Sequence, residues 1–148
     1  MRVELAVAFA LVLGLGVLAG RAQEPLVRDE AVLARQALMR EAKAALGVLS
    51  EMSGHRLRFD RQTARAAKRR LSSALRRLPR VFEAAYMDDH SHALPRIWQD
   101  EAGFTAAAAR ARSAARAVEI RSLPALRRSL PEVVSACLAC HRGFRRPP

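Results

Sequence analysis

The sequence predicts an all-α protein folded as an antiparallel four-helix bundle. After an apolar N-terminal run, apolar residues recur at helical spacing in four segments, and no segment of useful length alternates with period two. Residues typical of helix caps and breaks, among them Gly54, Asp60 and Ser122, separate these segments. Four amphipathic helices with short connections form a bundle, a fold that holds cofactors between facing helices.

The first two helices carry clear start and stop signals. The first is expected from about Leu26 to Met52, ended by Gly54 in a left-handed cap conformation. The second is expected to begin after Asp60, a good N-cap, and Pro79 should bend it or end its regular part. The expected core positions are Leu38, Ala42, Ala45, Leu49 and Met52, with Met39 and Leu46 beside them, and then Ala64, Ala67, Leu71, Ala74, Leu75, Leu78 and Phe82.

The third helix follows a polar connection over residues 87–96 and is expected as one element from about Pro95 to Glu119. Its apolar face should be buried against the other helices. The residues on that face are Ile97, Phe104, Ala108, Ala111, Ala115 and Val118.

The last helix should be capped by Ser122. Pro131 interrupts it, so a kink or restart is expected there, with Ser129 and Glu132 as a capping box. The tail over residues 145–148 should fray. One continuous stripe on this helix contains Leu126, Leu130, Val133, Val134, Cys137, Cys140, His141 and Phe144.

The end of that stripe is the run Cys137-Leu138-Ala139-Cys140-His141. In an exported protein a C-x-x-C-H run is typical of covalent attachment of a c-type haem. Cys137 and Cys140 would form thioethers to the two vinyl groups, and His141 would be the proximal iron ligand. On a helix these positions are i, i+3 and i+4, so their side chains leave from one face and can reach one flat cofactor.

Other interpretations of these residues have weaker support. A thioredoxin-like redox pair expects a βαβ context, and nothing in the chain has the pattern of a strand. A structural zinc site would need further donors from His55, His90 and His92. Asp88 and Asp89 with the two loop histidines could suggest a metal site, but side chains this close together in a loop are more often solvated.

The N-terminus has the pattern of a secretory leader. Residues 5–19 form an uncharged apolar run, and small residues follow it, with cleavage expected after Ala22. We therefore expect a signal peptide over residues 1–22, one haem domain over residues 23–148 and a periplasmic location. Export to this oxidising compartment suits haem attachment, and with Cys137 and Cys140 used as anchors no thiol remains for a structural disulfide. Because Glu4 makes the start less basic than usual, an uncleaved membrane anchor is the alternative.

The chain is strongly basic, with 26 Lys and Arg residues against 14 Asp and Glu residues and a formal net charge of +12. Such a charge suits nucleic acid, an anionic membrane surface or an acidic protein. The arginines are spread over every predicted helix, and no basic arm with interleaved aromatic residues is present. Nucleic acid is not the expected partner of an exported protein. We interpret the charge as a solvated surface that steers an acidic redox partner.

With its haem motif at the C-terminal end of a four-helix chain, the sequence resembles the class II cytochromes c, meaning cytochrome c′ and its low-spin relatives. Phe144 and Arg145 after the motif resemble the usual family ending. The run Pro-Arg-Ile-Trp-Gln-Asp over residues 95–100, followed by Gly-Phe, and the run Arg-Gln-Ala-Leu-Met over residues 35–39 are also similar to family segments. Pro131 and the loop with two histidines depart from the family pattern.

The resemblance implies roles for several more residues. The position over the haem face opposite His141 falls on Met39, and a slip of one residue would place Leu38 there. Arg35 and Gln36 are implied to lie near the haem propionates, and Arg145 to shield the proximal imidazole or bind a propionate. From the residues alone, Met39 is better explained as a core filler, because methionine on a helical apolar face usually packs, and Arg145 is also explained as a cation at a helix C-terminus.

We therefore predict a monohaem electron carrier, not an enzyme, with low-spin iron between His141 and Met39. The alternative is a five-coordinate cytochrome c′-like protein that binds nitric oxide or carbon monoxide. The expected partner is a redox protein with an acidic docking surface. The resemblance also implies pairing of two chains through the first two helices, which exposed arginines such as Arg65, Arg69 and Arg76 would oppose.

Overall fold

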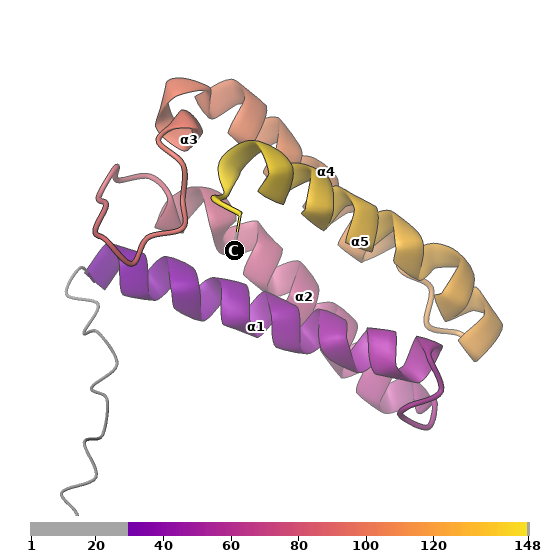
Figure 1. Ribbon diagram of the computed structural model, residues 1–148. Helices are drawn as coiled ribbons and strands as arrows, with labels where there is room; N and C mark the ends of the chain where they lie inside the picture. Colours follow the sequence, from indigo (N-terminus) through magenta and orange to yellow (C-terminus); the bar gives the residue numbers. More distant parts are fainter. Residues whose placement is uncertain (1–29, 148) are drawn as a thin grey trace, which may run out of the picture.

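Four long helices and one short helix make up the described part of the chain, residues 30–147 of a computed structural model (Figure 1). The predicted signal peptide lies outside the described residues. The prediction of an all-α four-helix bundle is confirmed. The helices are α1 (Glu30–Ser53), α2 (Arg61–Val81), α3 (Arg96–Gln99), α4 (Glu101–Ala117) and α5 (Leu123–Phe144).

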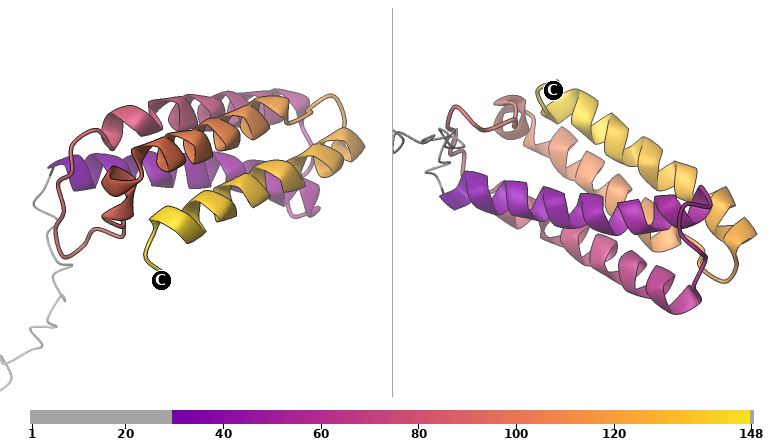
Figure 2. Two further views of the ribbon diagram at one scale, coloured as in Figure 1. Left: turned by 90° about the horizontal axis from the view of Figure 1, so that it is seen from above. Right: turned by 60° about the horizontal axis from the view of Figure 1, so that its bottom comes forward.

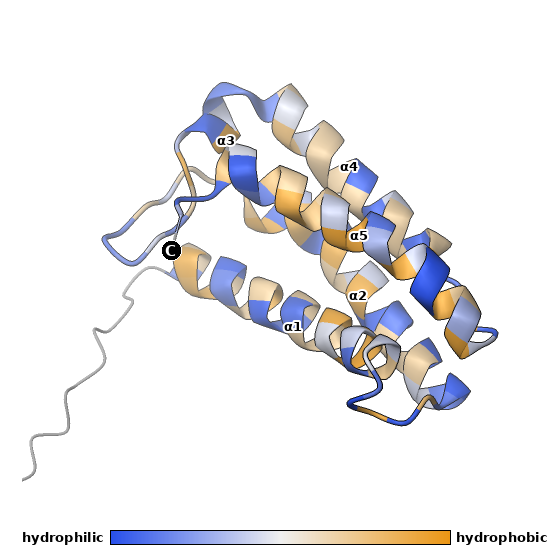
Figure 3. Cartoon of the chain, turned by 45° about the vertical axis from the view of Figure 1, so that its right-hand side comes forward, coloured by the Kyte–Doolittle hydropathy of each residue, from blue (hydrophilic) through white to orange (hydrophobic). Residues whose placement is uncertain are grey.

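The long helices pack in a ring, each against two others. α1 contacts α2 and α5, and α4 contacts the same two helices from the other side (Figures 1 and 2). Among the described elements, the backbones of the diagonal pairs α1 with α4 and α2 with α5 do not approach each other closely. The apolar faces point inward, as the hydropathy colouring shows (Figure 3). No helix in the described range is both long and apolar enough to span a bilayer.

The expected core face of α1 is the observed one. Leu38, Ala42, Ala45, Leu49 and Met52 are all buried. The end of the helix differs from the prediction, because Gly54 does not adopt a positive φ. His55 does so instead, with φ of 60°, while the Gly54 amide still donates to the Ser50 carbonyl oxygen at 2.9 Å. The helical hydrogen bonding thus continues through Gly54, and the left-handed residue falls one position later.

α2 begins as predicted. The Asp60 carboxylate accepts a hydrogen bond from the Thr63 amide at 2.6 Å and so satisfies one of the free donors of the first turn. Pro79 lies inside the helix, which ends at Val81. The predicted buried positions of α2 from Ala64 to Leu78 are buried in the structure.

The expected single third helix is divided into α3 and α4. The break is at Asp100, whose backbone leaves the helical region with φ of −125° and ψ of 60°. Its carboxylate accepts from the Gly103 amide at 3.0 Å and caps α4. A β-carbon at Gly103 would come within 2.6 Å of Asp100 Oδ1, so the cap depends on glycine at this position.

α5 has the predicted cap but not the predicted restart. Ser122 Oγ accepts from the Ala125 amide at 3.3 Å, and the helix then runs unbroken past Pro131. The expected capping box at Ser129 is therefore wrong. Ser129 Oγ instead donates to the Ala125 carbonyl oxygen at 3.0 Å and accepts from the Glu119 amide at 2.8 Å, so it joins α5 to the connection before it.

Candidate haem-attachment site

The last three turns of α5 carry the C-x-x-C-H run. Cys137 and Cys140 are unpaired, half-buried thiols, and Cys137 packs against the core cluster. His141 is exposed, and Leu138 is 53% exposed, an unusual state for leucine. Two accessible thiols, an accessible imidazole and uncovered apolar surface on consecutive turns of one helix fit a covalently attached haem c, which would cover that surface.

The electrostatics of this site favour the uncharged form of all three side chains. Partial burial raises the pKa of both Cys137 and Cys140; at Cys140 the neighbouring Cys137 adds to the increase and Arg110 opposes it. Partial desolvation, and then the charge of Arg145, lower the pKa of His141. The lower pKa favours the neutral imidazole, which is the form that binds a metal.

Met39 and Leu38 occupy different flanks of α1. Leu38 is 4% exposed and belongs to the core cluster, whereas Met39 is half-buried and packs at its edge. The Glu41 carboxylate pairs with Arg77, so the flank of α1 that carries Glu41 faces α2. Met39 is about 200° around the helix from Glu41 and lies on the other flank. The long helices packed against α1 are α2 and α5, so Met39 lies on the flank of α1 toward α5.

Arg35 has a structural environment that sequence analysis did not anticipate. Its side chain is buried, and its guanidinium donates to the carbonyl oxygens of Val81, Ala84 and Tyr86, with distances of 2.9 Å to Val81 and 2.6 Å to Tyr86. Its Cζ also lies 5.2 Å from the ring centroid of Phe82. Arg35 thus holds the segment after α2 against α1, and its implied contact with a haem propionate stays a prediction.

Gln36 extends the same attachment. Its side-chain amide donates to the His90 carbonyl oxygen at 3.2 Å, which ties the loop between α2 and α3 to α1 a second time. A propionate contact for Gln36 likewise stays a prediction. Neither loop attachment had a sequence signal, because the acceptors are backbone carbonyls.

The same loop is joined to the C-terminus, and the expected fraying after the haem motif is wrong for residues 145 and 146. Ala93 and Arg145 form an isolated antiparallel bridge. The Arg146 amide donates to the His92 carbonyl oxygen at 2.8 Å, and Arg146 Nη2 donates to the Ser91 carbonyl oxygen at 3.0 Å. The loop over residues 81–94 therefore connects the Arg35–Met39 segment of α1 to the end of the haem motif.

Aromatic rings fill the bundle at this end. Phe104 lies 5.1 Å from Phe82 and 5.4 Å from Phe144, measured between ring centroids. The Trp98 indole nitrogen donates to the Phe82 carbonyl oxygen at 2.7 Å. These contacts link α2, α3, α4 and α5 beside the haem motif and give Trp98 and Phe104 a packing role. The Arg145 side chain is exposed one turn beyond His141, and its propionate contact also stays a prediction.

The remaining candidate ligands lie elsewhere. Met52 is buried in the core near the C-terminal end of α1, and the Met87 sulfur accepts from Ser91 Oγ at 3.5 Å in the loop. His55 contacts Arg127 at the opposite end of the bundle from the motif. Within residues 30–147, no group of three or more His, Cys, Asp or Glu side chains is placed to hold a metal ion, in the loop of His90 and His92 or elsewhere.

Comparisons with known proteins agree with this site and fold. The family model described as cytochrome C′ matches residues 30–145. The cytochrome c′ of Rhodopseudomonas palustris is 25% identical over 121 residues, which cover 80% of this chain and 83% of that protein. The structure of cytochrome c′ from Rhodobacter sphaeroides has a TM-score of 0.74 and 24% identity, covering 80% of this chain and 96% of that one.

A further relative, cytochrome c′ from Alcaligenes xylosoxidans, was solved as a variant with carbon monoxide bound. It has a TM-score of 0.71 and 21% identity and covers 79% of this chain and 94% of that one. The family match spans all five helices and the haem motif. The chain belongs to the cytochrome c′ family, and Cys137 and Cys140 near its C-terminus fit the attachment of the family's covalent haem c.

Proposed function

We propose that this chain is a periplasmic cytochrome c′ whose haem iron is five-coordinate, held by His141, and binds nitric oxide or carbon monoxide on the opposite face. The observation that carries the proposal is the family match over residues 30–145, together with one relative whose variants were solved with these gases bound. Besides the variant with carbon monoxide, another variant of the Alcaligenes xylosoxidans protein was solved as a nitric oxide complex. When bound, the haem supplies the iron and its affinity for small diatomic ligands.

In this proposal Met39 is an apolar cover over the open face. Its half-buried position at the edge of the core, on the α5 side of α1, supports this role. A flexible methionine adapts to an irregular apolar space, so it can exclude water and still yield to a diatomic gas. The polarity and steric access of this space decide how tightly a gas binds.

The second candidate is the low-spin electron carrier that the sequence favoured. The observation behind it is the same flank position of Met39, because a thioether facing α5 could serve as an axial ligand. The comparisons support the five-coordinate function better, since the matched relatives are cytochromes c′ and one of them is known with carbon monoxide and nitric oxide.

The visible spectrum of the reduced holoprotein, before and after carbon monoxide, separates the two functions. Five-coordinate iron gives a high-spin spectrum that shifts when carbon monoxide is added. A split low-spin spectrum without any response to carbon monoxide would contradict the proposal and support ligation by Met39.

Two methionine variants sharpen this experiment. For five-coordinate iron, Met39→Leu should stay high-spin, and Met39→Ala should bind carbon monoxide more tightly because the cover is smaller. Met52→Leu is the control, since Met52 is buried near the other end of α1. If Met39→Leu turns a low-spin protein high-spin while Met52→Leu does not, Met39 is an iron ligand.

We further propose that the protein performs no substrate chemistry and exchanges electrons with a partner that has an acidic docking surface. Exposed Arg142, Arg145 and Arg146 at the end of the haem motif support this docking. Raising the ionic strength should therefore slow reduction by such a partner more than reduction by a small neutral reductant.

A further inference from the structure

The solvent face of α2 carries charge of a single sign. Its 21 residues include seven arginines, one lysine and no acidic residue. Arg61, Arg65, Arg69, Arg76 and Arg80 are all exposed, and helical geometry places them within one stripe about 28 Å long. Arg77 pairs with Glu41, and within the described residues no other arginine of α2 forms an ion pair.

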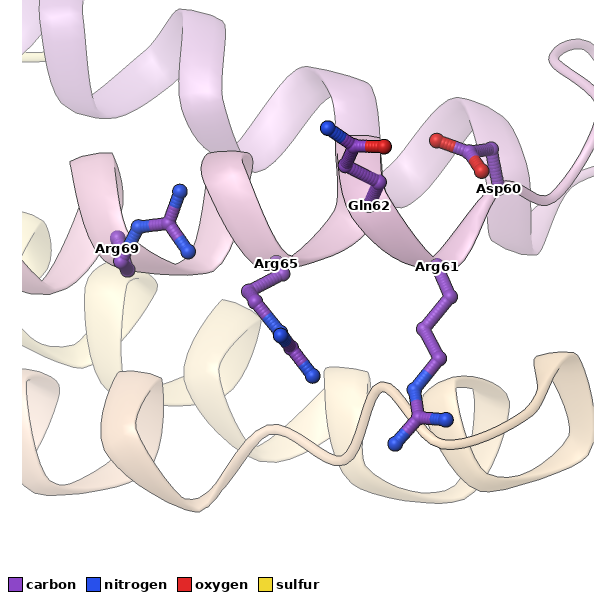
Figure 4. A pocket seen from close by; sticks show the side chains of 5 residues that line it. All are labelled: Asp60, Arg61, Gln62, Arg65 and Arg69. Atoms are coloured by element: carbon purple, nitrogen blue, oxygen red, sulfur yellow. The ribbon is translucent and has the colours of Figure 1, made fainter.

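The first half of this stripe borders a surface hollow. Arg61, Arg65 and Arg69 line it together with Asp60 and Gln62, and its volume is about 500 Å³ (Figure 4). Asp60 is the acidic residue of the lining, and its carboxylate is already engaged as the N-cap of α2. The three guanidinium groups therefore lie next to a space that ligand groups can enter.

We propose that this arginine stripe binds the phosphate headgroups of an anionic phospholipid bilayer and holds the protein on the membrane surface. Guanidinium forks match phosphate geometry with paired hydrogen bonds, and this stripe consists entirely of arginine. Cationic side chains next to an anionic leaflet each strengthen attachment. This inference is independent of the gas-binding function.

An anionic bilayer fits this face better than an acidic protein does. Protein interfaces concentrate binding energy in buried aromatic and aliphatic anchors. The exposed large hydrophobic side chains of the described residues, Leu33, Leu57, Tyr86, Met87 and Leu138, all lie outside α2. A fluid layer of headgroups needs no such anchor, because its charges rearrange to meet the arginines.

The position of the stripe is also unsuited to a redox partner. α2 is diagonal to α5 in the ring, and the two backbones do not approach each other closely. Near the Arg61 end of the stripe, α5 is joined to the end of α1, because Arg127 Nε donates to the Ser53 carbonyl oxygen at 2.9 Å. Cys137 lies ten residues after Arg127 on α5, which places it about 15 Å from Arg127 along the helix axis. A molecule resting on α2 would keep α5 and its haem on the side away from the bilayer.

The test is sedimentation of the mature holoprotein with vesicles of phosphatidylcholine, with and without about one quarter phosphatidylglycerol, at about 0.1 M salt. Binding is expected to the anionic vesicles only. The triple variant Arg61→Gln, Arg65→Gln, Arg69→Gln should reduce the partition coefficient by about a hundredfold. The triple variant with lysine at these positions should bind more tightly than the glutamine variant, because the charge is kept, but less tightly than the unmodified protein, because an ammonium lacks the paired donors. The haem spectrum and helical circular dichroism report whether each variant folds.

A matched triple variant removes the same charge from other faces: Arg40→Gln, Lys43→Gln and Arg128→Gln, all at exposed positions of α1 and α5. It should keep binding within a few-fold of the unmodified protein. Equal losses in the two triple variants would overturn the proposal, since net charge alone would then explain binding. Absence of binding to the anionic vesicles would also overturn it. A third outcome would also overturn the proposal: soluble polyglutamate binds to this face and vesicles do not. That result would assign the stripe to an acidic protein.

Discussion

The guanidinium of Arg35 lies over the indole ring of Trp98, with Cζ 5.0 Å from the ring centroid. This contact joins α1 to α3, and the same guanidinium donates to three carbonyl oxygens of the segment after α2. A single buried cation therefore organises the end of the bundle that also contains the haem motif. Because charged hydrogen bonds and a partly desolvated cation over a ring are both strong, much of the local stability should depend on Arg35.

Replacing Arg35 with alanine should lower the free energy of unfolding by about 2–4 kcal/mol, because three carbonyl oxygens lose their charged donor and two aromatic rings lose the buried guanidinium that packs on them. Arg35→Lys should recover only part of this loss, since one ammonium cannot reproduce the planar fork. Denaturant titration of the holoprotein measures both. Arg40→Ala is the control at an exposed position of the same helix and should cost under about 0.5 kcal/mol. Similar losses for Arg35→Ala and Arg40→Ala would contradict the role of Arg35.

Gly103 should be strongly coupled to Asp100. In the unmodified chain, Gly103→Ala is expected to destabilise the protein by about 1 kcal/mol, because the new β-carbon displaces the capping carboxylate. In an Asp100→Ala background the cap is already lost, so Gly103→Ala should stabilise by up to about 1 kcal/mol through helix propensity. A double-mutant cycle of denaturant midpoints measures this reversal of sign. Additive effects would show that the carboxylate and the β-carbon do not compete.

The sequence was most informative where a structural cause is local. Asp60 and Ser122 are caps whose partners lie three residues away, and the core faces follow from helical periodicity. The contacts of Arg35 could not be predicted, because they join residues 46 to 51 positions apart and end on backbone carbonyls of no distinctive sequence. The break at Asp100 was missed because the apolar spacing continues on both sides of it. The haem motif could be predicted because its three residues lie within one short run of sequence. The residue of α1 that faces it across the bundle depends on how α1 is rotated about its axis, and a slip of one residue exchanges Met39 for Leu38.

The Asp60 cap should make stability depend on pH. Hydrogen bonds from Thr63, first from its side chain and then from its backbone amide, lower the pKa of Asp60 below its ordinary value of 3.8. A carboxyl with a lower pKa in the folded state stabilises the protein above the unfolded pKa, and that stabilisation is lost as the pH falls through the folded pKa. Asp60→Asn should therefore show a smaller loss of stability than the unmodified protein when the pH falls from about 5 to below 3.8. Parallel pH curves from thermal denaturation would contradict this expectation.

The joint between the C-terminus and the loop should control local opening rather than global stability. Arg146→Ala removes the Nη2 bond to the Ser91 carbonyl oxygen but keeps the backbone bond to the His92 carbonyl oxygen. Arg146→Pro removes both, and the extended backbone of Arg145 accepts a following proline. The free energy of local opening should therefore fall by about 1 kcal/mol in the first variant and about 2 kcal/mol in the second.

Hydrogen exchange of the amides in residues 88–94 measures this opening, while the melting temperature should change little. Arg142→Ala, an exposed change in the last turn of α5, is the control and should leave the exchange unaffected. Because the His90 carbonyl oxygen also holds Gln36, faster opening should extend to the α1 segment that carries Met39. In the proline variant, carbon monoxide should consequently bind to the reduced protein at a higher rate. Unchanged exchange in both Arg146 variants would mean that Arg146 does not hold the loop, which α1 and the bond from the Leu94 amide to the Phe144 carbonyl oxygen would then hold without it.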